Sequence, residues 1–231
     1  MIATDRFVFL HLHKSGGSYV IDCLQRFLTG VREIGYHLPA SLIPPALAGK
    51  PVLGLVRNPW SYYVSWYSFQ RQRPQPNQLF QVLSDGGTLD FRATVNNMLD
   101  LAEGGALLDT LVARLPANYG GRGLNLPGPV LATIRGSGRG FYGFLYEHMY
   151  GALQANLHID RMEALPGSLL DLFAAVGQPV DEPLRAHLAS APPRNPSQHG
   201  QYTSYYDEAL RERVARMDAA VIARHGYRYG D

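Results

Sequence analysis

The first hydrophobic pattern in the chain is a continuous apolar run that ends abruptly in small polar residues. Residues 7–12 are apolar at nearly every position, which is typical of a central strand covered on both faces of a sheet. After Ser18, apolar residues recur at helical spacing and stop near Thr29-Gly30. The pattern therefore predicts a buried strand, a tight turn and a helix that Ser18 caps.

The same pattern returns at residues 51–69. Residues 51–56 indicate a second buried strand, and Asn58 with Pro59 forms a strong helix start, as cap and first helical residue. Ser61 and Ser65 lie one turn apart, so they share a face of this second helix. Strands that alternate with helices in this way predict an α/β fold.

The chemistry of the first turn points to anion binding. Gly16 and Gly17 permit a tight turn and leave backbone amides uncovered, while Lys14 adds a positive charge beside the helix N-terminus. A solvated lysine beside an ordinary Gly-Gly turn remains the alternative. The phosphate loop of nucleotide triphosphatases has its lysine after the glycines, whereas Lys14 precedes them, which argues against a standard ATPase.

Taken together, the two stretches resemble the sulfotransferases that use 3′-phosphoadenosine 5′-phosphosulfate (PAPS). In that family the first strand ends in Pro-Lys-Thr-Gly-Gly-Thr, to which residues 13–18 are similar, with His13 in place of the proline. The family's second motif is Arg-Asn/Asp-Pro with a serine eight positions after the arginine, which Arg57 and Ser65 match. Residues 161–165 and 205–227 are more loosely similar to bacterial members.

The resemblance implies both a fold and a function. The fold would be a single α/β domain over residues 1–231, with a central, mostly parallel sheet flanked by helices, related to phosphate-loop proteins. The function would be transfer of a sulfuryl group from PAPS to a hydroxyl or amine of a small-molecule or glycan acceptor, leaving 3′-phosphoadenosine 5′-phosphate (PAP) and using no metal. The implied cofactor-binding residues are Lys14, Ser15, Gly16, Gly17, Ser18, Arg57, Ser65 and Arg194.

The residue that removes the proton from the acceptor is expected between the two motifs. In an open parallel sheet this segment lies near the carboxyl ends of the strands, where ligands bind, and many sulfotransferases have a histidine or glutamate there. His37 is the first candidate and Glu33 the second, with Lys14 as the third catalytic residue. His37 as a loop histidine bonded to backbone is the alternative, and His11 is expected to pack internally.

The middle of the chain carries less chemistry. Residues 70–115 read mostly as helix with packing residues. Residues 116–143 contain eight glycines and three prolines, which excludes long regular elements and predicts either a substrate loop or a surface loop without a role. Residues 141–150 form an aromatic, helical segment, and residues 205–226 predict one closing amphipathic helix.

Composition limits the classes of protein. With 231 residues, 46% of them hydrophobic, the chain can bury one substantial core. The net charge of +2 without a basic run argues against a nucleic-acid partner. The single Cys23 excludes an internal disulfide. No apolar stretch reaches the roughly 18 to 20 residues of a membrane span, so we expect a soluble, cytoplasmic protein like the bacterial sulfotransferases, of unspecified oligomeric state.

Two other functions remain open at this point. A small-molecule kinase would share the phosphate-loop architecture, but it needs a lysine after the glycines and a metal-binding carboxylate after a strand, and neither stands out. A non-catalytic nucleotide-binding domain would keep the cofactor site and lack the base. No His, Cys or carboxylate cluster in the sequence has the spacing of metal ligands.

Overall fold

The computed structural model describes residues 1–151, 153, 155–190 and 199–231. The chain divides into two compact units, which we describe separately. The first comprises Met1–Arg57 and Tyr146–Pro196, and the second comprises Asn58–Leu145 and Ser197–Asp231. The prediction of a single domain over the whole chain stays a prediction. Arg194 and the rest of 191–198 lie outside the described residues.

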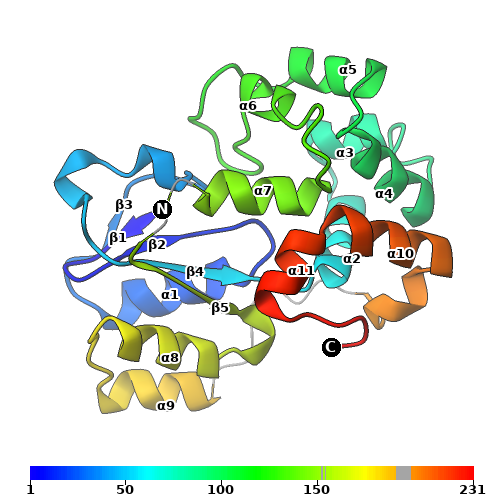
Figure 1. The fold of residues 1–231 in the computed structure, drawn as a ribbon. Helices are drawn as coiled ribbons and strands as arrows, with labels where there is room; N and C mark the ends of the chain where they lie inside the picture. Colours follow the sequence, from blue (N-terminus) through cyan, green and yellow to red (C-terminus); the bar gives the residue numbers. More distant parts are fainter. Residues whose placement is uncertain (152, 154, 191–198) are drawn as a thin grey trace. The chain divides into compact units, whose positions relative to one another are not determined.

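The first unit is built on a five-stranded sheet of order β3-β1-β2-β4-β5 (Figure 1). The strands are β1 (Ile2–Ala3), β2 (Val8–Leu10), β3 (Arg32–Glu33), β4 (Val52–Val56) and β5 (Leu157–Arg161). Both predicted buried strands are confirmed as β2 and β4, and they pair in parallel with each other, as β4 does with β5. Strands β1 and β3 are antiparallel additions of two residues each, too short to leave a periodic pattern, so the sheet is mixed.

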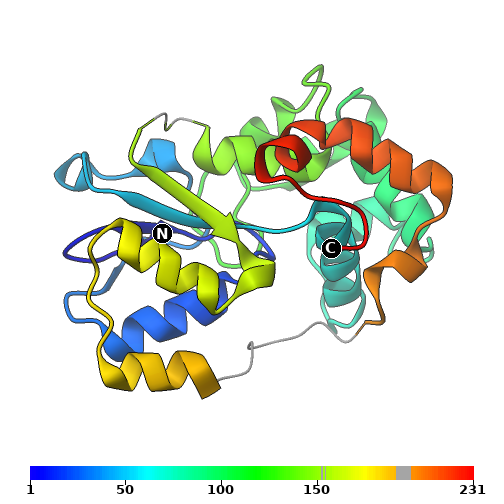
Figure 2. The same ribbon diagram turned by 60° about the horizontal axis from the view of Figure 1, so that its bottom comes forward.

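Helices α1 (Gly17–Phe27), α8 (Gly167–Ala175) and α9 (Glu182–Ser190) cover one face of the sheet (Figures 1 and 2). Their apolar sides bury a core together with Phe9, Leu53 and other inward residues of the strands. Cys23 lies inside this core as a packed thiol, as expected. Short 3-10 turns η1 (Ala40–Leu42), η2 (Pro45–Leu47) and η3 (Met162–Ala164) occupy the connections.

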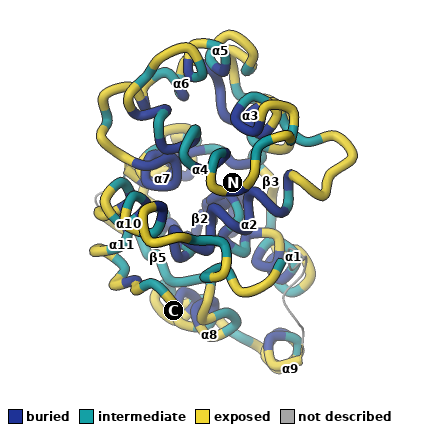
Figure 3. The backbone as a smooth tube through the Cα atoms, turned by 90° about the vertical axis from the view of Figure 1, so that its right-hand side faces the viewer, coloured by how far each residue is buried: buried dark blue, intermediate teal, exposed yellow. Residues whose placement is uncertain are grey.

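The opposite face of the sheet receives the second half of α7 (Phe141–Tyr150). Tyr150 donates a hydrogen bond from its hydroxyl to the main-chain oxygen of Leu55, at 3.1 Å. Gly54 makes room for this ring, because a Cβ at that position would lie 2.5 Å from the tyrosine hydroxyl. The aromatic segment predicted at 141–150 is therefore a core helix, and Figure 3 shows it buried.

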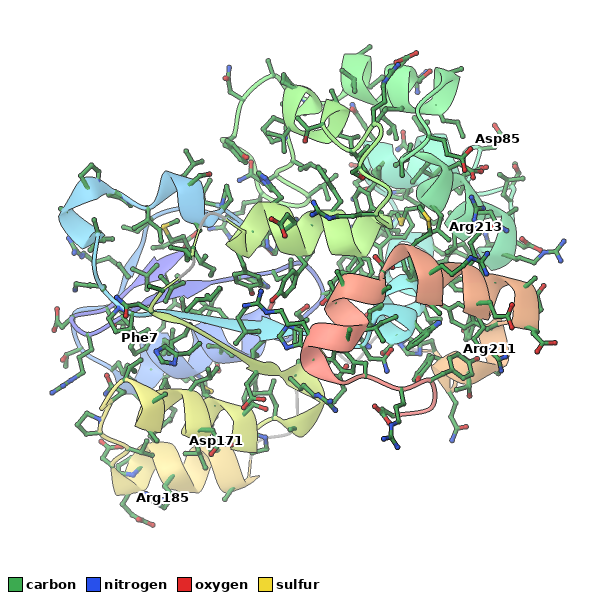
Figure 4. The ribbon with its side chains drawn as sticks, viewed as in Figure 1. Phe7, Asp85, Asp171, Arg185, Arg211 and Arg213 are labelled. Carbon is green, nitrogen blue, oxygen red and sulfur yellow. The ribbon has the colours of Figure 1, made fainter. Side chains whose placement is uncertain are left out.

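The second unit is helical. It contains α2 (Pro59–Arg71), α3 (Gln78–Leu83), α4 (Phe91–Asp100), α5 (Ala106–Arg114), α6 (Gly128–Ala132), the first half of α7, η4 (Tyr202–Tyr205), α10 (Glu208–Met217) and α11 (Ala219–His225). Asn58 caps α2 as predicted, accepting from the amide of Trp60 at 3.1 Å. Arg213, labelled in Figure 4, reaches from α10 to Asn96 and Asp100 of α4.

The predicted closing helix is wrong in one respect, because Asp218 divides it into α10 and α11. The Asp218 carboxylate is buried and turns inward. It accepts hydrogen bonds from the hydroxyl of Tyr63 at 2.8 Å and from the amide of Gly143, in the first turn of α7, at 2.7 Å. A periodic pattern of apolar residues does not report such an inward turn, since α10 and α11 keep their apolar faces on either side of it.

The Gly/Pro-rich segment 116–143 holds the short α6 and the start of α7. Arg135 in this segment pairs with Asp109 of α5. The segment is otherwise irregular, as predicted, and whether it meets a substrate stays a prediction. Within the described residues, no helix is long and apolar enough to cross a membrane.

Candidate functional site

The turn between β2 and α1 leaves the helix N-terminus without a side-chain cap. Gly16 is the N-cap residue and has a φ of 76°, a left-handed conformation that favours glycine. Gly16 has no side chain that could accept a capping hydrogen bond, and the first turn carries no acidic residue. Ser18 was predicted to be the cap, which is wrong, because it lies inside the first turn and is exposed. Its hydroxyl remains at the N-terminal end of the helix.

Lys14 lies immediately before this helix start. Its φ of 56° is unusual for a residue with a side chain, and it bends the backbone away from the direction of β2. Burial, followed by the positive charge of Arg57, lowers the pKa of Lys14 from 10.5 to about 8. The lysine is therefore mostly protonated at neutral pH.

Arg57, in the second sequence motif, contacts Lys14 in the first motif. Because β2 and β4 are neighbouring parallel strands, their carboxyl ends lie at the same edge of the sheet. Arg57 directly follows β4, and its Nη1 donates a hydrogen bond to the main-chain oxygen of Lys14 at 3.1 Å. The two cations named by the sequence motifs are thus adjacent within the first unit.

His37 also belongs to this edge. It follows β3 in a left-handed conformation, with a φ of 48°, and its Nδ1 lies 2.5 Å from the main-chain oxygen of His11. Since a carbonyl oxygen only accepts, Nδ1 carries the proton of the neutral ring and Nε2 carries the lone pair. Only 5% of His37 is exposed. Burial first, then the neighbouring His13 and His11, holds its pKa well below the ordinary value.

His11 packs directly against the start of α1, in agreement with the expectation that it packs internally. A Cβ on Gly17 would lie 1.9 Å from Cδ2 of the His11 ring, so only glycine fits at this position. Burial lowers the pKa of His11 to about 3, with a smaller effect from the neighbouring His13. The His11 imidazole is therefore uncharged, and it packs between the turn and the start of α1.

The other predicted site residues are distributed as follows. Ser15 is buried, and its hydroxyl donates to the main-chain oxygen of His13 at 3.2 Å. Glu33 is exposed on the edge strand β3, opposite Ile2, and its negative charge raises the pKa of the N-terminal ammonium against the larger effect of burial. Ser65 is buried in α2 and belongs to the second unit. The structure therefore brings Lys14, Arg57 and His37 together with residues 15–18.

Sequence reasoning missed the stacking of His13 on His37. The two rings stack, with centroids 3.8 Å apart and planes inclined by 19°. His11 and His13 are two residues apart, a spacing that places extended residues on one side of the chain, and this was the available signal. This spacing gave no indication that His37, which follows β3, would pack against the rings of His11 and His13.

A second glycine-rich stretch, 136–140, also precedes a helix start, that of α7. Its helix N-terminus is already satisfied from within the protein, because Asp218 accepts from the amide of Gly143 and the Tyr63 hydroxyl accepts from the amide of Tyr142. The carboxyl group of Asp218 therefore occupies the place that a bound anion would take there. Across the ranges that the structure describes, no three His, Cys, Asp or Glu side chains are arranged to hold a metal ion.

Comparison with solved structures found a protein of similar fold. The structure is similar to that of mouse sulfotransferase SULT7A1 complexed with PAP, with a TM-score of 0.53 and 12% sequence identity. The likeness covers 97% of this chain and 91% of the mouse chain. Comparisons of the sequence with models of protein families and with curated proteins found no match. The chain therefore has an α/β fold with a mixed, helix-flanked sheet, as in that sulfotransferase.

Proposed function

We propose that this protein is a sulfotransferase that moves a sulfuryl group from PAPS to a hydroxyl or amine of a small-molecule or glycan acceptor in the cytoplasm. The observation that carries the proposal is the contact between Arg57 and the Lys14 main-chain oxygen at the uncapped N-terminus of α1. It joins the two sequence motifs at one sheet edge, in a chain with the fold of a sulfotransferase that has been solved with PAP.

The residues at this edge fit an anionic cofactor. The first turn of α1 offers backbone amides and the positive end of the helix dipole, and Lys14 precedes this turn in the chain. We assign Lys14 with Ser15, Gly16, Gly17 and Ser18 to the 5′-phosphosulfate. We assign Arg57 and Ser65 to the 3′-phosphate, and Arg194 remains a proposed further contact with it. The positive charge of Arg57 lowers the pKa of Lys14, and a ligand of opposite charge would offset this repulsion.

The chemistry needs little beyond alignment and charge stabilisation. PAPS, when bound, supplies the sulfuryl group, which bonds to the acceptor atom as PAP leaves. Lys14 stabilises negative charge that develops on the oxygens of the transferring group. His37 accepts the acceptor's proton at Nε2, while Nδ1–H stays on the His11 oxygen. Glu33 is the second candidate for this proton, since it lies on the strand that leads to His37.

Calorimetric and thermal-shift titrations with PAP, ADP and ATP, each with and without Mg²⁺, test the cofactor. A ligand at 100 times its dissociation constant stabilises the folded state by about 2.7 kcal/mol, which gives a clear shift. We expect tight, metal-independent binding of PAP that requires the 3′-phosphate and is lost in Arg57→Ala. Preference for ATP with Mg²⁺ would contradict the proposal and favour the kinase.

Transfer itself requires a second experiment, in which radiolabelled PAPS is incubated with a panel of phenolic, alcohol, amine and glycan acceptors. We expect His37→Ala to keep its affinity for PAP and to lose transfer. PAP binding without transfer to any acceptor, together with an unchanged rate of PAPS hydrolysis in His37→Ala, would favour a non-catalytic nucleotide-binding domain. These two outcomes separate an enzyme from a binding module with the same cofactor site.

A further inference from the structure

Three imidazole rings form one group beside Lys14, which we call the histidine stack: His11, His13 and His37. The ring of His37 lies 3.8 Å from that of His13 and 4.2 Å from that of His11, between centroids. His11 and His13 belong to the turn after β2, whereas His37 follows β3. All three side chains are at least nine-tenths buried.

We propose that His13 is a positioning residue, which holds the ring of His37 so that Nε2 is the nitrogen that takes the proton of the acceptor. The proposal rests on the proposed function of His37, and it assigns to His13 a task that the sulfotransferase motif does not contain. The resembled motif has proline at this position, and a proline has no aromatic face on which an imidazole can stack.

Two of the contacts of His37 restrain its ring in complementary ways. The hydrogen bond from Nδ1 to the His11 oxygen, at 2.5 Å, selects the tautomer and fixes one edge of the ring. That single bond still permits the ring plane to rotate about it. The stacked ring of His13, inclined by only 19°, fixes the plane. Together they determine the direction of the Nε2 lone pair.

The charges around His37 keep its ring neutral. The groups that face it are His13, His11, the N-terminal ammonium of Met1 and the edge of Tyr36, whose ring centroid lies 4.1 Å away. None of these carries a negative charge at neutral pH, and burial further disfavours a charged imidazole. A proton acceptor must be unprotonated before the reaction, which this setting provides. Loss of the His13 imidazole would remove one of the repelling neighbours and raise the pKa of His37.

The first test is a measurement on the unaltered protein. Two-dimensional ¹⁵N–¹H correlation spectra of the imidazole rings distinguish the Nδ1–H from the Nε2–H tautomer, with His37→Gln used to assign the signals. We expect His37 as the neutral Nδ1–H form at pH 7, with or without PAP. An Nε2–H tautomer or a protonated ring at that pH would overturn the proposal without reference to any activity.

The second test compares His13→Ala with His13→Phe, which keeps a flat ring and removes the imidazole nitrogens. Misplacement of a catalytic group by about 1 Å can cost on the order of 100-fold in rate, so we expect kcat of His13→Ala to fall by roughly 10- to 100-fold. We expect a smaller loss in His13→Phe, with the affinity for PAP retained in both variants. Mixed tautomers of His37 should appear only in His13→Ala.

The outcomes separate this proposal from the proposed function. Failure of the unaltered protein to bind PAP contradicts the sulfotransferase, whatever the tautomer of His37. Normal PAP binding and transfer, with kcat and tautomer unchanged in His13→Ala, overturns only the role of His13. Equal losses of kcat in His13→Ala and His13→Phe would also overturn it, because stacking would then be irrelevant. If His13→Ala does not fold, the tautomer of His37 in the unaltered protein and the kcat of His13→Phe still test the role of His13.

Discussion

The guanidinium of Arg57 donates a hydrogen bond to the main-chain oxygen of Lys14, 43 residues away in the sequence, at 3.1 Å. The contact holds the backbone of the first motif, while the charge of Arg57 contributes to the lowered pKa of Lys14. The hydrogen bond therefore holds the two residues together, although their positive charges repel each other. An anion bound beside both residues, as proposed here, would offset this repulsion and leave the contact in place.

This contact predicts that Arg57 and Lys14 act together in binding PAP. Arg57→Ala removes its own charge and also releases the backbone that places the Lys14 ammonium. We therefore expect the double variant Lys14→Ala/Arg57→Ala to lose less binding free energy than the two single variants summed, by about 0.5 to 3 kcal/mol. Calorimetric titration of all four proteins with PAP measures this coupling.

A control for surface charge is available on α9, where Arg185 is exposed and points to solvent (Figure 4). Arg185→Ala removes one positive charge and should leave the affinity for PAP unchanged. Strictly additive losses in Lys14→Ala and Arg57→Ala would show that the two residues act independently, and would contradict the positioning role of Arg57.

The lowered pKa of Lys14 predicts proton uptake when PAP binds. With a pKa of about 8, Lys14 is mostly deprotonated at pH 9 in the protein without ligand. A nearby phosphate favours the protonated form and raises the pKa of Lys14. Binding at pH 9 should therefore take up close to one proton per site, and affinity should weaken as the pH rises through 8. Calorimetry in buffers of different ionisation enthalpy measures the number of protons.

Lys14→Arg is the matched variant for this experiment, because an arginine stays protonated across the whole range. We expect its proton uptake at pH 9 to vanish and its affinity for PAP to be nearly independent of pH between 7 and 9. Proton uptake that persists in Lys14→Arg would mean that another group gains the proton when PAP binds, and would contradict the assignment to Lys14.

Gly17 and Gly167 provide a test of the packing at the start of α1. Each is the first residue of its helix, but a Cβ on Gly17 would collide with the His11 ring, whereas a Cβ on Gly167 meets nothing within 4 Å. We expect Gly17→Ala to destabilise the fold by about 1 to 3 kcal/mol, as overpacking does. Gly167→Ala should be neutral or stabilise by up to about 1 kcal/mol.

Urea unfolding of both alanine variants measures the difference. Because His11 supplies the oxygen that fixes His37, Gly17→Ala should also change the imidazole signals of His37 in the nuclear magnetic resonance spectrum. Equal stability of the two variants would mean that the His11 ring moves aside without cost.

Much of this site could be predicted because its parts follow strands directly. Residues 7–12 and 51–56 are continuous apolar runs, and the two parallel strands they form end at one edge, where Lys14 and Arg57 had to meet. The helix start at Asn58 was readable because cap and proline act locally. His37 was placed near that edge by topology and by family resemblance.

The remainder depended on contacts between distant residues. β1 and β3 have two residues each, so no period marks them. Ser18 resembles a cap in sequence, yet with the left-handed Gly16 as N-cap the helix begins two residues earlier than it would with Ser18 as the cap. The stacking of His13 on His37 and the division of the last helix at Asp218 arise from tertiary packing. Local patterns contain none of this information.

Asp218 is a buried carboxyl group in the second unit, and the sign of its effect on stability can be stated. Burial raises the pKa of this carboxyl from 3.8 to about 7, against smaller opposing effects of the hydrogen bonds from Tyr63 and Gly143. The folded state therefore holds a proton between pH 4 and 7 that the unfolded state has released. Stability from this group is complete below pH 4 and is lost as the pH rises through 7.

Asp218→Asn isolates this loss. A shift of three pKa units corresponds to roughly 4 kcal/mol. Because asparagine cannot ionise, the unfolding free energy of Asp218→Asn should rise relative to that of the unaltered protein by an amount of that order between pH 4 and 8. Any cost of replacing the carboxyl's bonds to Tyr63 is a constant offset over this range. Urea midpoints measured at each pH follow the shift. Asp171→Asn, on the exposed side of α8 (Figure 4), is the control and should track the unaltered protein. Parallel pH profiles of Asp218→Asn and the unaltered protein would mean that the buried carboxylate stays ionised, because its two hydrogen bonds then outweigh the cost of burial.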